Sequence, residues 1–211
     1  MKTAAIVPVK SFVHAKTRLD IGSRQREEIC KIMLEEILHV LMISPKIDET
    51  VVVTREEKIS NICRQFDATM IFDEEERGVN SAVSLADRHL LENGFDASIV
   101  IPQDIPFIKT QDIDFILKHA IPPNFAIIVP SRKFDGTNAL VRMPVNLMET
   151  HYDEDSYKIH MNVAKKHTAN ASLVFVKRIM WDVDDKEDLE FLLGQNEKPD
   201  ISEKISKILN K

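Results

Sequence analysis

Short apolar runs alternate along the chain with longer segments in which apolar residues recur every three or four positions. The short runs predict strands buried on both faces, because such strands need no polar alternation. The longer segments predict amphipathic helices. The strands are predicted at residues 4–9, 49–54, 68–72, 97–101, 126–129, 138–143 and 173–176.

Helical periodicity is clear at residues 24–42, where Ile29, Met33 and Ile37 fall on one face of the predicted helix. Ser23 precedes this segment and is the expected N-cap, because a serine hydroxyl accepts a hydrogen bond from the first helical turn. Further helices are predicted at residues 55–66, 79–93, 111–120 and 186–193. The apolar spacing of the tail predicts one more helix within residues 195–211.

Strands that alternate with helices are typical of a mostly parallel sheet with helices on both faces. We therefore expect a three-layer, Rossmann-like α/β fold. The 211 residues and the 44% apolar content suit a single domain over residues 1–211, with its helical tail packed back on the body. In such sheets ligands bind beyond the carboxyl ends of the strands, where several polar motifs begin.

The overall charge limits which partners the protein can bind. A formal net charge of −6 argues against nucleic acid as a binding partner, because the protein has no dominant basic field to replace the phosphate counterions. The two cysteines, Cys30 and Cys63, form no metal-binding pattern and are expected to be reduced thiols. The first apolar run is too short for a signal peptide, and no stretch approaches a membrane span. We expect a cytoplasmic protein that binds neither nucleic acid nor membrane.

Three cations follow the first predicted strand: Lys10, Lys16 and Arg18. A polyphosphate needs positive charge of this kind near a helix N-terminus, where backbone N–H groups are available. The alternative is a solvated basic loop, since lysine and arginine are normally exposed. No glycine occurs in this segment, although an α/β nucleotide-binding protein normally has its glycine-rich phosphate loop here.

Two acidic segments offer metal ligands. Asp104 follows the strand predicted at 97–101 and lies between Pro102 and Pro106, in a rigid turn at the ligand edge. Magnesium bound to a nucleotide takes one or two carboxylates, although a turn aspartate would look the same. Asp182 and Asp184 share a face of an extended segment, and either could be a second ligand. Acids that only stabilise a helix N-terminus are the alternative for this pair.

Further polar residues lie beside the predicted helices and strands. Gly78 would let the backbone approach a ligand closely, and Asn80 offers both donors and an acceptor, although both also suit a helix cap. The loop at 130–140 could equally be a simple hairpin. Its Arg132 and Lys133 could meet a phosphorylated acceptor, with hydrogen bonds from Thr137 and Asn138. On a helix, two further candidates would share one face: Ser156 and His160.

Four motifs in order, AIVPVKSFVHAKTRL (5–19), IPQDIPFI (101–108), FDGTNAL (134–140) and DVDDKEDL (182–189), resemble the 2-phospho-L-lactate guanylyltransferase family of coenzyme F420 biosynthesis. The resemblance extends from residue 5 to about residue 193. It implies a nucleotidyltransferase domain of the nucleotide-diphospho-sugar transferase, or glycosyltransferase-A-like, type. It also implies Mg²⁺-dependent guanylyl transfer from GTP to 2-phospho-L-lactate, phosphoenolpyruvate or 3-phosphoglycerate, with release of pyrophosphate.

The resemblance assigns roles to individual residues. It implies that three cations hold the triphosphate and are catalytic, Lys10, Lys16 and Arg18, and that two residues lie beside the nucleotide, Gly78 and Asn80. Asp104 and Asp184 match metal-binding positions. Thr137 and Ser156 match positions that contact the acid, and we add Arg132, Asn138 and His160 as candidates near the acceptor.

The sequence departs from the family at three places, and alternatives follow. It has Gln103 where the family often has a small residue, and FDGTN where the family has GTGTN. It also has Tyr152-Asp153 where the family tends to have Phe-Gly, which puts an acid near the proposed anion site and leaves the identity of the acceptor open. The alternatives are another nucleotidyltransferase, such as a molybdopterin cytidylyl- or guanylyltransferase, or a non-catalytic nucleotide-binding scaffold. A homodimer through the apolar tail and a downstream transferase that accepts the product are the partners considered.

Overall fold

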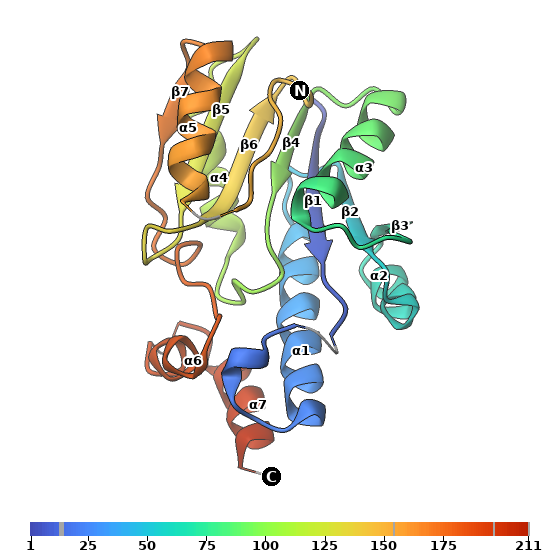
Figure 1. The fold of residues 1–211 in the computed structure, drawn as a ribbon, viewed down its shortest axis with the longest axis vertical. Helices are drawn as coiled ribbons and strands as arrows, with labels where there is room; N and C mark the ends of the chain where they lie inside the picture. The colour runs from blue at the N-terminus through green and yellow to red at the C-terminus, as the bar shows by residue number, and fades with distance from the viewer. Residues whose placement is uncertain (13–14, 154, 196, 211) are drawn as a thin grey trace.

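The computed structural model describes residues 1–12, 15–153, 155–195 and 197–210 (Figure 1). Five residues of the predicted motifs and tail lie outside the described residues: Val13, His14, Glu154, Asn196 and Lys211. No helix among the described residues has both the length and the apolar character needed to cross a membrane.

The described strands form a seven-stranded sheet in the order β3-β2-β1-β4-β6-β5-β7. Strand β6 is antiparallel to both of its neighbours, and the other strand pairs are parallel. The predicted mostly parallel sheet is therefore confirmed. The strands are β1 (Thr3–Val9), β2 (Glu49–Thr54), β3 (Thr69–Phe72), β4 (Ala97–Val100), β5 (Phe125–Pro130), β6 (Thr137–Met143) and β7 (Ala171–Leu173).

Helices cover both faces of the sheet (Figure 1). Apolar residues of α1, α2 and α4 pack on one face, and those of α3 and α5 pack on the other. The main helices are α1 (Ser23–Met42), α2 (Ser60–Gln65), α3 (Val79–Glu92), α4 (Thr110–Leu117), α5 (Ser156–His167), α6 (Lys186–Leu193) and α7 (Pro199–Leu209), with 3₁₀ turns η1 (Thr17–Leu19) and η2 (Glu57–Ile59).

Several predicted boundaries are wrong, including that of the helix predicted at 111–120, which is α4 and ends at Leu117. Ser23 is the first helical residue, and Gly22 is the N-cap, whose N–H donates to Gln25 Oε1 at 3.2 Å. The helix predicted at 55–66 is η2 followed by α2. The strand predicted at 173–176 is β7, which ends at Leu173. Val174 and Val176 follow β7 and are also buried. The apolar run in the sequence therefore predicted burial correctly, but burial continues beyond the last residue that pairs with a neighbouring strand.

The C-terminal helices lie at the carboxyl end of β1, beside the first turn of α1 (Figure 1). Apolar residues of α1, η1, α6 and α7 form one cluster there, which includes the fully buried Leu19 and Ile205. Lys198, at the N-cap of α7, donates to the carbonyl oxygens of Pro106 and Ile108, at 3.2 and 2.5 Å, and to Glu36 at 2.6 Å. The tail therefore holds the loop that follows Asp104.

Candidate active site

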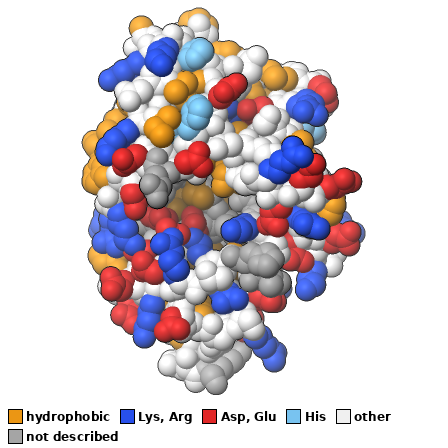
Figure 2. Space-filling model, in the orientation of Figure 1, with side chains coloured by type: hydrophobic (Ala, Val, Ile, Leu, Met, Phe, Trp, Pro, Cys, Tyr) orange, Lys and Arg blue, Asp and Glu red, His pale blue; other side chains and the backbone are white. Residues whose placement is uncertain are grey.

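A cavity of about 580 Å³ lies at the carboxyl ends of β1 to β4. Figure 2 shows the molecule hollowed on this face, with acidic and basic side chains around the hollow. Among the described residues, five cations and five carboxylates line the cavity: Lys10, Lys16, Arg18, Arg55, Arg77, Asp73, Glu76, Asp104, Asp153 and Asp184. Because the formal charges of these ten side chains cancel, a bound triphosphate would need additional positive charge, which a divalent ion would supply.

Lys16 joins the two carboxylates that the sequence predicts as metal ligands. Its Nζ donates to Asp104 Oδ2 at 2.5 Å and to Asp184 Oδ1 at 2.7 Å. The Lys16 side chain is only 9% exposed. Burial lowers the pKa of Lys16, but the two carboxylates outweigh burial, and the pKa is raised above its usual value. Arg18 adds a longer ion pair with Asp184, at 3.7 Å.

Lys16 also has an unusual backbone conformation. Its φ of 54° and ψ of 38° lie in the left-handed region, which is uncommon for a residue with a side chain. The 3₁₀ turn η1 that follows is anchored by Leu19, which is fully buried. Such conformations cost about 1 kcal/mol or more and occur where the surrounding structure holds them in place. The fold therefore holds the ammonium of Lys16 at the carboxylates.

The two acidic segments meet through the backbone. The N–H of Val183 donates to the carbonyl oxygen of Asp104 at 3.0 Å, so residues 182–184 run beside the turn that carries Asp104. Burial above all, and then the neighbouring Asp104 carboxylate, raises the pKa of Asp182 to about 6, although a hydrogen bond from Asn138 acts to lower it. The site thus brings Asp104, Asp182 and Asp184 together.

The carboxylates fit a divalent metal ion. Asp104 Oδ1 is buried and has no hydrogen-bond partner among the described residues. Oxygens of this kind are the ligands that Mg²⁺ prefers, and a nucleotide-bound Mg²⁺ needs only one or two of them. No group of three or more His, Cys, Asp or Glu within the described ranges forms a metal site by itself. The geometry therefore suits an ion that arrives with phosphate oxygens.

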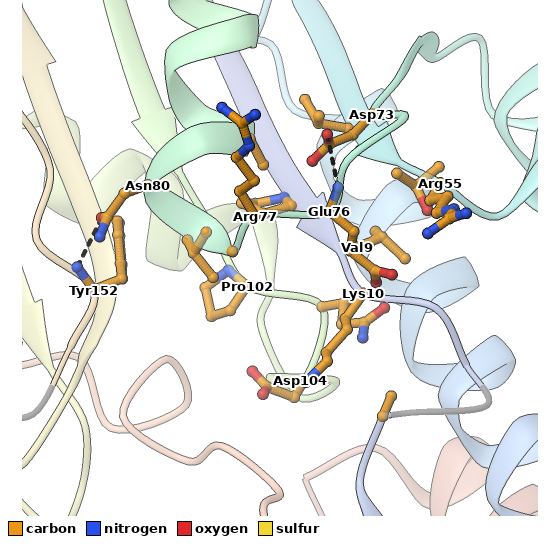
Figure 3. Close-up of a pocket in the computed structure, with 18 of the residues that line it drawn as sticks. Val9, Lys10, Arg55, Asp73, Glu76, Arg77, Asn80, Pro102, Asp104 and Tyr152 are labelled. Carbon is orange, nitrogen blue, oxygen red and sulfur yellow. Dashed lines mark hydrogen bonds between the residues drawn. The ribbon is translucent and has the colours of Figure 1, made fainter.

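Gly78 and Asn80 line the same cavity. Gly78 has φ 102° and ψ 177°, which residues with a Cβ rarely adopt, and a Cβ there would meet no atom within 4 Å. The backbone at Gly78 is thus open to close approach. Asn80 Oδ1 accepts the Tyr152 N–H at 2.8 Å (Figure 3), and its Nδ2 has no partner in the described part of the chain.

Three predicted acceptor-binding residues form a buried network instead of lining the cavity. Thr137 Oγ1 accepts from Ser156 Oγ at 3.0 Å and lies 2.9 Å from His160 Nδ1. His160 Nε2 accepts the His151 N–H at 2.8 Å, so the ring proton is on Nδ1 and is donated to Thr137. Burial above all, with His151 and Arg142 nearby, lowers the pKa of His160 to about 3, so the ring is neutral. The network anchors the start of α5.

Arg132 and Asn138 hold the acidic segment and do not line the cavity. Arg132 Nη2 pairs with Asp188 at 2.9 Å, and Asn138 Nδ2 donates to Asp182 Oδ1 at 3.0 Å. Both contacts fasten residues 182–188 to β6 and to the loop before it. For all five of these residues, contact with the acceptor stays a prediction.

The cavity includes side chains that the sequence reasoning missed. Arg55 and Asp73 directly follow β2 and β3, and Glu76 accepts the Ser11 N–H at 2.7 Å. Figure 3 shows Arg55, Asp73 and Glu76 near one end of the cavity and Asp104 at the other. The signal that identified Asp104, a polar residue directly after a buried strand, was present at Arg55 and Asp73 as well.

The fold is that of the nucleotide-diphospho-sugar transferases. It is similar to a protein described as a nucleotide-diphospho-sugar transferase from Desulfovibrio desulfuricans, with TM-score 0.73, 14% identity and coverage of 93% of this chain and 88% of that one. The 4-diphosphocytidyl-2C-methyl-D-erythritol synthase of Anaerococcus prevotii is similar with TM-score 0.67, 13% identity and coverage of 93% and 96%. The predicted fold class is confirmed.

Within this fold, residues 3–207 match the family described as "Guanylyl transferase CofC like", and the chain belongs to that family. It is 29% identical to the phosphoenolpyruvate guanylyltransferase of Conexibacter woesei, over 91% of this chain and 87% of that one. It is 28% identical to the 2-phospho-L-lactate guanylyltransferase of Methanothermobacter thermautotrophicus, over 99% and 92%. It is 31% identical to the 3-phospho-D-glycerate guanylyltransferase of Colwellia psychrerythraea, over 91% of both. The resemblance read from the four motifs is confirmed.

Proposed function

We propose that this protein transfers the guanylyl group of GTP to a small phosphorylated acid, with release of pyrophosphate, in the biosynthesis of coenzyme F420. The observation that carries the proposal is the contact of Lys16 with Asp104 and Asp184 at the cavity of a guanylyl transferase family member. The acid is 2-phospho-L-lactate, phosphoenolpyruvate or 3-phosphoglycerate, the acids named for the relatives.

The binding of GTP follows from the charges in the cavity. Lys10, Lys16 and Arg18 bind the triphosphate, because all three line the cavity and carry positive charge. Gly78 lets the backbone approach the nucleotide, and the free Nδ2 of Asn80 donates to it.

The transfer needs no general base from the protein. A phosphate monoester is largely dianionic near neutral pH, because its second pKa is about 6. One oxygen of the acceptor phosphate attacks the α-phosphorus of GTP and forms the new P–O bond. The bond from the α-phosphorus to the α,β-bridging oxygen breaks, and pyrophosphate leaves with the electron pair. Positioning and charge neutralisation by the chain's cations lower the barrier.

Mg²⁺ is held by Asp104 and Asp184 in this proposal, and when bound it neutralises charge on the phosphate oxygens. With an ion at these carboxylates, the Lys16 ammonium would leave them. It would remain next to the phosphates and would bind them. Asp182 lies beside the pair and is the alternative second ligand, as its spacing already predicts.

Pyrophosphate release tests the proposal. The purified protein is assayed with Mg²⁺, each of the four nucleoside triphosphates and each of the three acids, and the products are identified by mass spectrometry. We expect release only with GTP and one of the acids, and a product that contains both. Binding of GTP without release in any combination would instead indicate a nucleotide-binding scaffold.

Partners of the proposed enzyme are tested separately. A homodimer is checked by light scattering on the full chain. Transfer of the product to a downstream enzyme is checked by comparing coupled turnover with the release of free product. Both partners stay predictions.

A further inference from the structure

The cavity has two chemically different ends. Lys16, Asp104 and Asp184 meet at the carboxyl end of β4, whereas Asp73 lies at the carboxyl end of β3. Figure 3 shows Val9 and Lys10 between Asp73 and Asp104. Strands β2 and β1 separate β3 from β4, which places the two ends about 14 Å apart at the usual strand spacing of about 4.8 Å. A nucleoside with its phosphates spans such a distance, whereas a three-carbon phosphorylated acid does not.

The Asp73 carboxylate is fixed in place and still has an acceptor to offer. Its Oδ1 accepts the N–H groups of Glu75 and Glu76, at 3.3 and 3.1 Å. Asp73 is 5% exposed and lines the cavity. Among the described residues, no cation forms an ion pair with Asp73, and no donor bonds its Oδ2. A buried carboxylate of this kind gains most from a ligand that brings donors.

The other carboxylates of the cavity are engaged or exposed. Asp104 and Asp184 bind Lys16, and Glu76 Oε1 accepts the Ser11 N–H. Asp153 is exposed. Of these five described carboxylates, Asp73 alone is buried, is held in place and has an oxygen free to accept hydrogen bonds from a ligand. It lies at the end of the cavity away from Lys16.

Guanine matches such an acceptor better than the other bases do. Its Watson–Crick edge presents two adjacent donors, N1–H and the 2-amino group, and an ionised carboxylate is an acceptor only. Adenine and cytosine each present an acceptor nitrogen at that edge. Uracil presents one N–H between two carbonyl oxygens. A carboxylate facing the edge therefore accepts two hydrogen bonds from guanine and at most one from each of the other three.

We infer that Asp73 determines the base specificity of this protein, by accepting hydrogen bonds from N1–H and the 2-amino group of guanine. The inference rests on the proposed function and deepens it, because it names the residue that reads the base. Glu75 and Glu76 position the carboxylate through their N–H groups. Guanine at Asp73 directs the triphosphate along Val9 and Lys10 toward Lys16.

Calorimetric titration with three nucleotides tests the inference. GTP is compared with inosine triphosphate, which lacks the 2-amino group, and with xanthosine triphosphate, which has a carbonyl in its place. Each hydrogen bond to a charged group contributes about 10- to 100-fold in affinity, so the wild-type protein should bind GTP at least about 10-fold more tightly than either analogue. Wild-type protein that binds all three equally would overturn the inference without any variant.

Asp73→Asn supplies the complementary measurement. In this variant the amide oxygen keeps the bonds from the N–H groups of Glu75 and Glu76, so the amide nitrogen faces the ligand. It donates to the 2-carbonyl of xanthine and cannot accept from guanine, so this variant should prefer xanthosine triphosphate over GTP. Glu76→Gln is the matched control, because it removes one charge at the same end of the cavity and should leave the order of the three nucleotides unchanged.

The outcomes separate the inference from the proposed function. GTP binding by both proteins with an unchanged order of nucleotides in Asp73→Asn overturns the role of Asp73 and leaves the proposed function intact. Wild-type protein that binds no nucleotide with Mg²⁺ present overturns both.

Discussion

Lys16→Met tests whether the lysine ammonium and a metal ion compete for the same carboxylates. Methionine keeps an unbranched chain that ends where the lysine ammonium begins, and it removes the charge. Lys16 contacts both Asp104 and Asp184, so in the wild-type protein a metal ion must displace its ammonium. We expect the variant to bind a divalent ion more tightly without nucleotide and to bind GTP more weakly.

The size of the effect follows from the two contacts. A hydrogen bond to a charged group contributes about 1.5–3 kcal/mol. We count only the contact with Asp104, which is 18% exposed, because Asp184 is 38% exposed and its contact is screened by solvent. Removing the competing ammonium should therefore tighten metal binding by about 10- to 100-fold.

Binding of Mn²⁺, followed by electron paramagnetic resonance, measures this change without any turnover. Lys10→Met is the matched control, because Lys10 lines the cavity but has no ion pair with a carboxylate in the described residues. It should weaken GTP binding and leave Mn²⁺ binding unchanged. Thermal unfolding is a second readout, since an ion that binds the folded state more tightly stabilises it more. Mg²⁺ should therefore raise the melting temperature of Lys16→Met more than that of the wild type.

Equal Mn²⁺ affinity in the wild type and in folded Lys16→Met would refute the competition. A gain of the same size in Lys10→Met would also refute it, because the effect would then come from the overall charge of the cavity. Equal affinity would place the metal away from Asp104 and Asp184.

Three further predictions concern turnover and stability. Asp104→Asn should lower kcat at least about 100-fold, because it removes a charge needed in the transition state, while circular dichroism shows the fold intact. Lys198→Met should destabilise the protein by about 2–3 kcal/mol in urea titrations and should also slow turnover, because the lysine ammonium holds the loop after Asp104. Lys204 is exposed on the same helix, so Lys204→Met should change neither stability nor turnover. The free energy of unfolding should fall by about 1.4 kcal/mol per pH unit as the pH drops below about 6.5, because of His160. Only the unfolded state takes up a proton on this ring until the pH reaches about 3, the pKa of His160 in the folded protein. His160→Gln should remove this slope between pH 6.5 and 5, and the exposed His119→Gln should retain it.

The elements could be predicted because their signals are local. A buried strand is a run of apolar residues, and an amphipathic helix repeats its apolar residues every three or four positions, so neighbours in sequence suffice to identify both. Local signals also identified the ends of β1 and β4, and so the polar residues that follow these strands, Lys10 and Asp104. They failed at residues 173–176, because burial of Val174 and Val176 does not require a strand partner.

The reversed direction of β6 could not be read from the sequence. An apolar strand looks the same in both directions, and its partners β4 and β5 are found only when the chain folds. The direction of β6 in turn decides what surrounds Thr137. Its hydroxyl therefore meets Ser156 and His160, which the sequence had placed at the acceptor.

The residue types of the site are present in the sequence, but their partners come from the tertiary structure. Lys16 lies 88 residues from Asp104 and 168 residues from Asp184, and the sheet brings all three within hydrogen-bonding distance. Local propensity carries no information over such separations, because the order of strands is decided by how the whole core packs. The sequence alone thus determined which charges follow which strands, and packing of the sheet decided that a lysine holds the two carboxylates together.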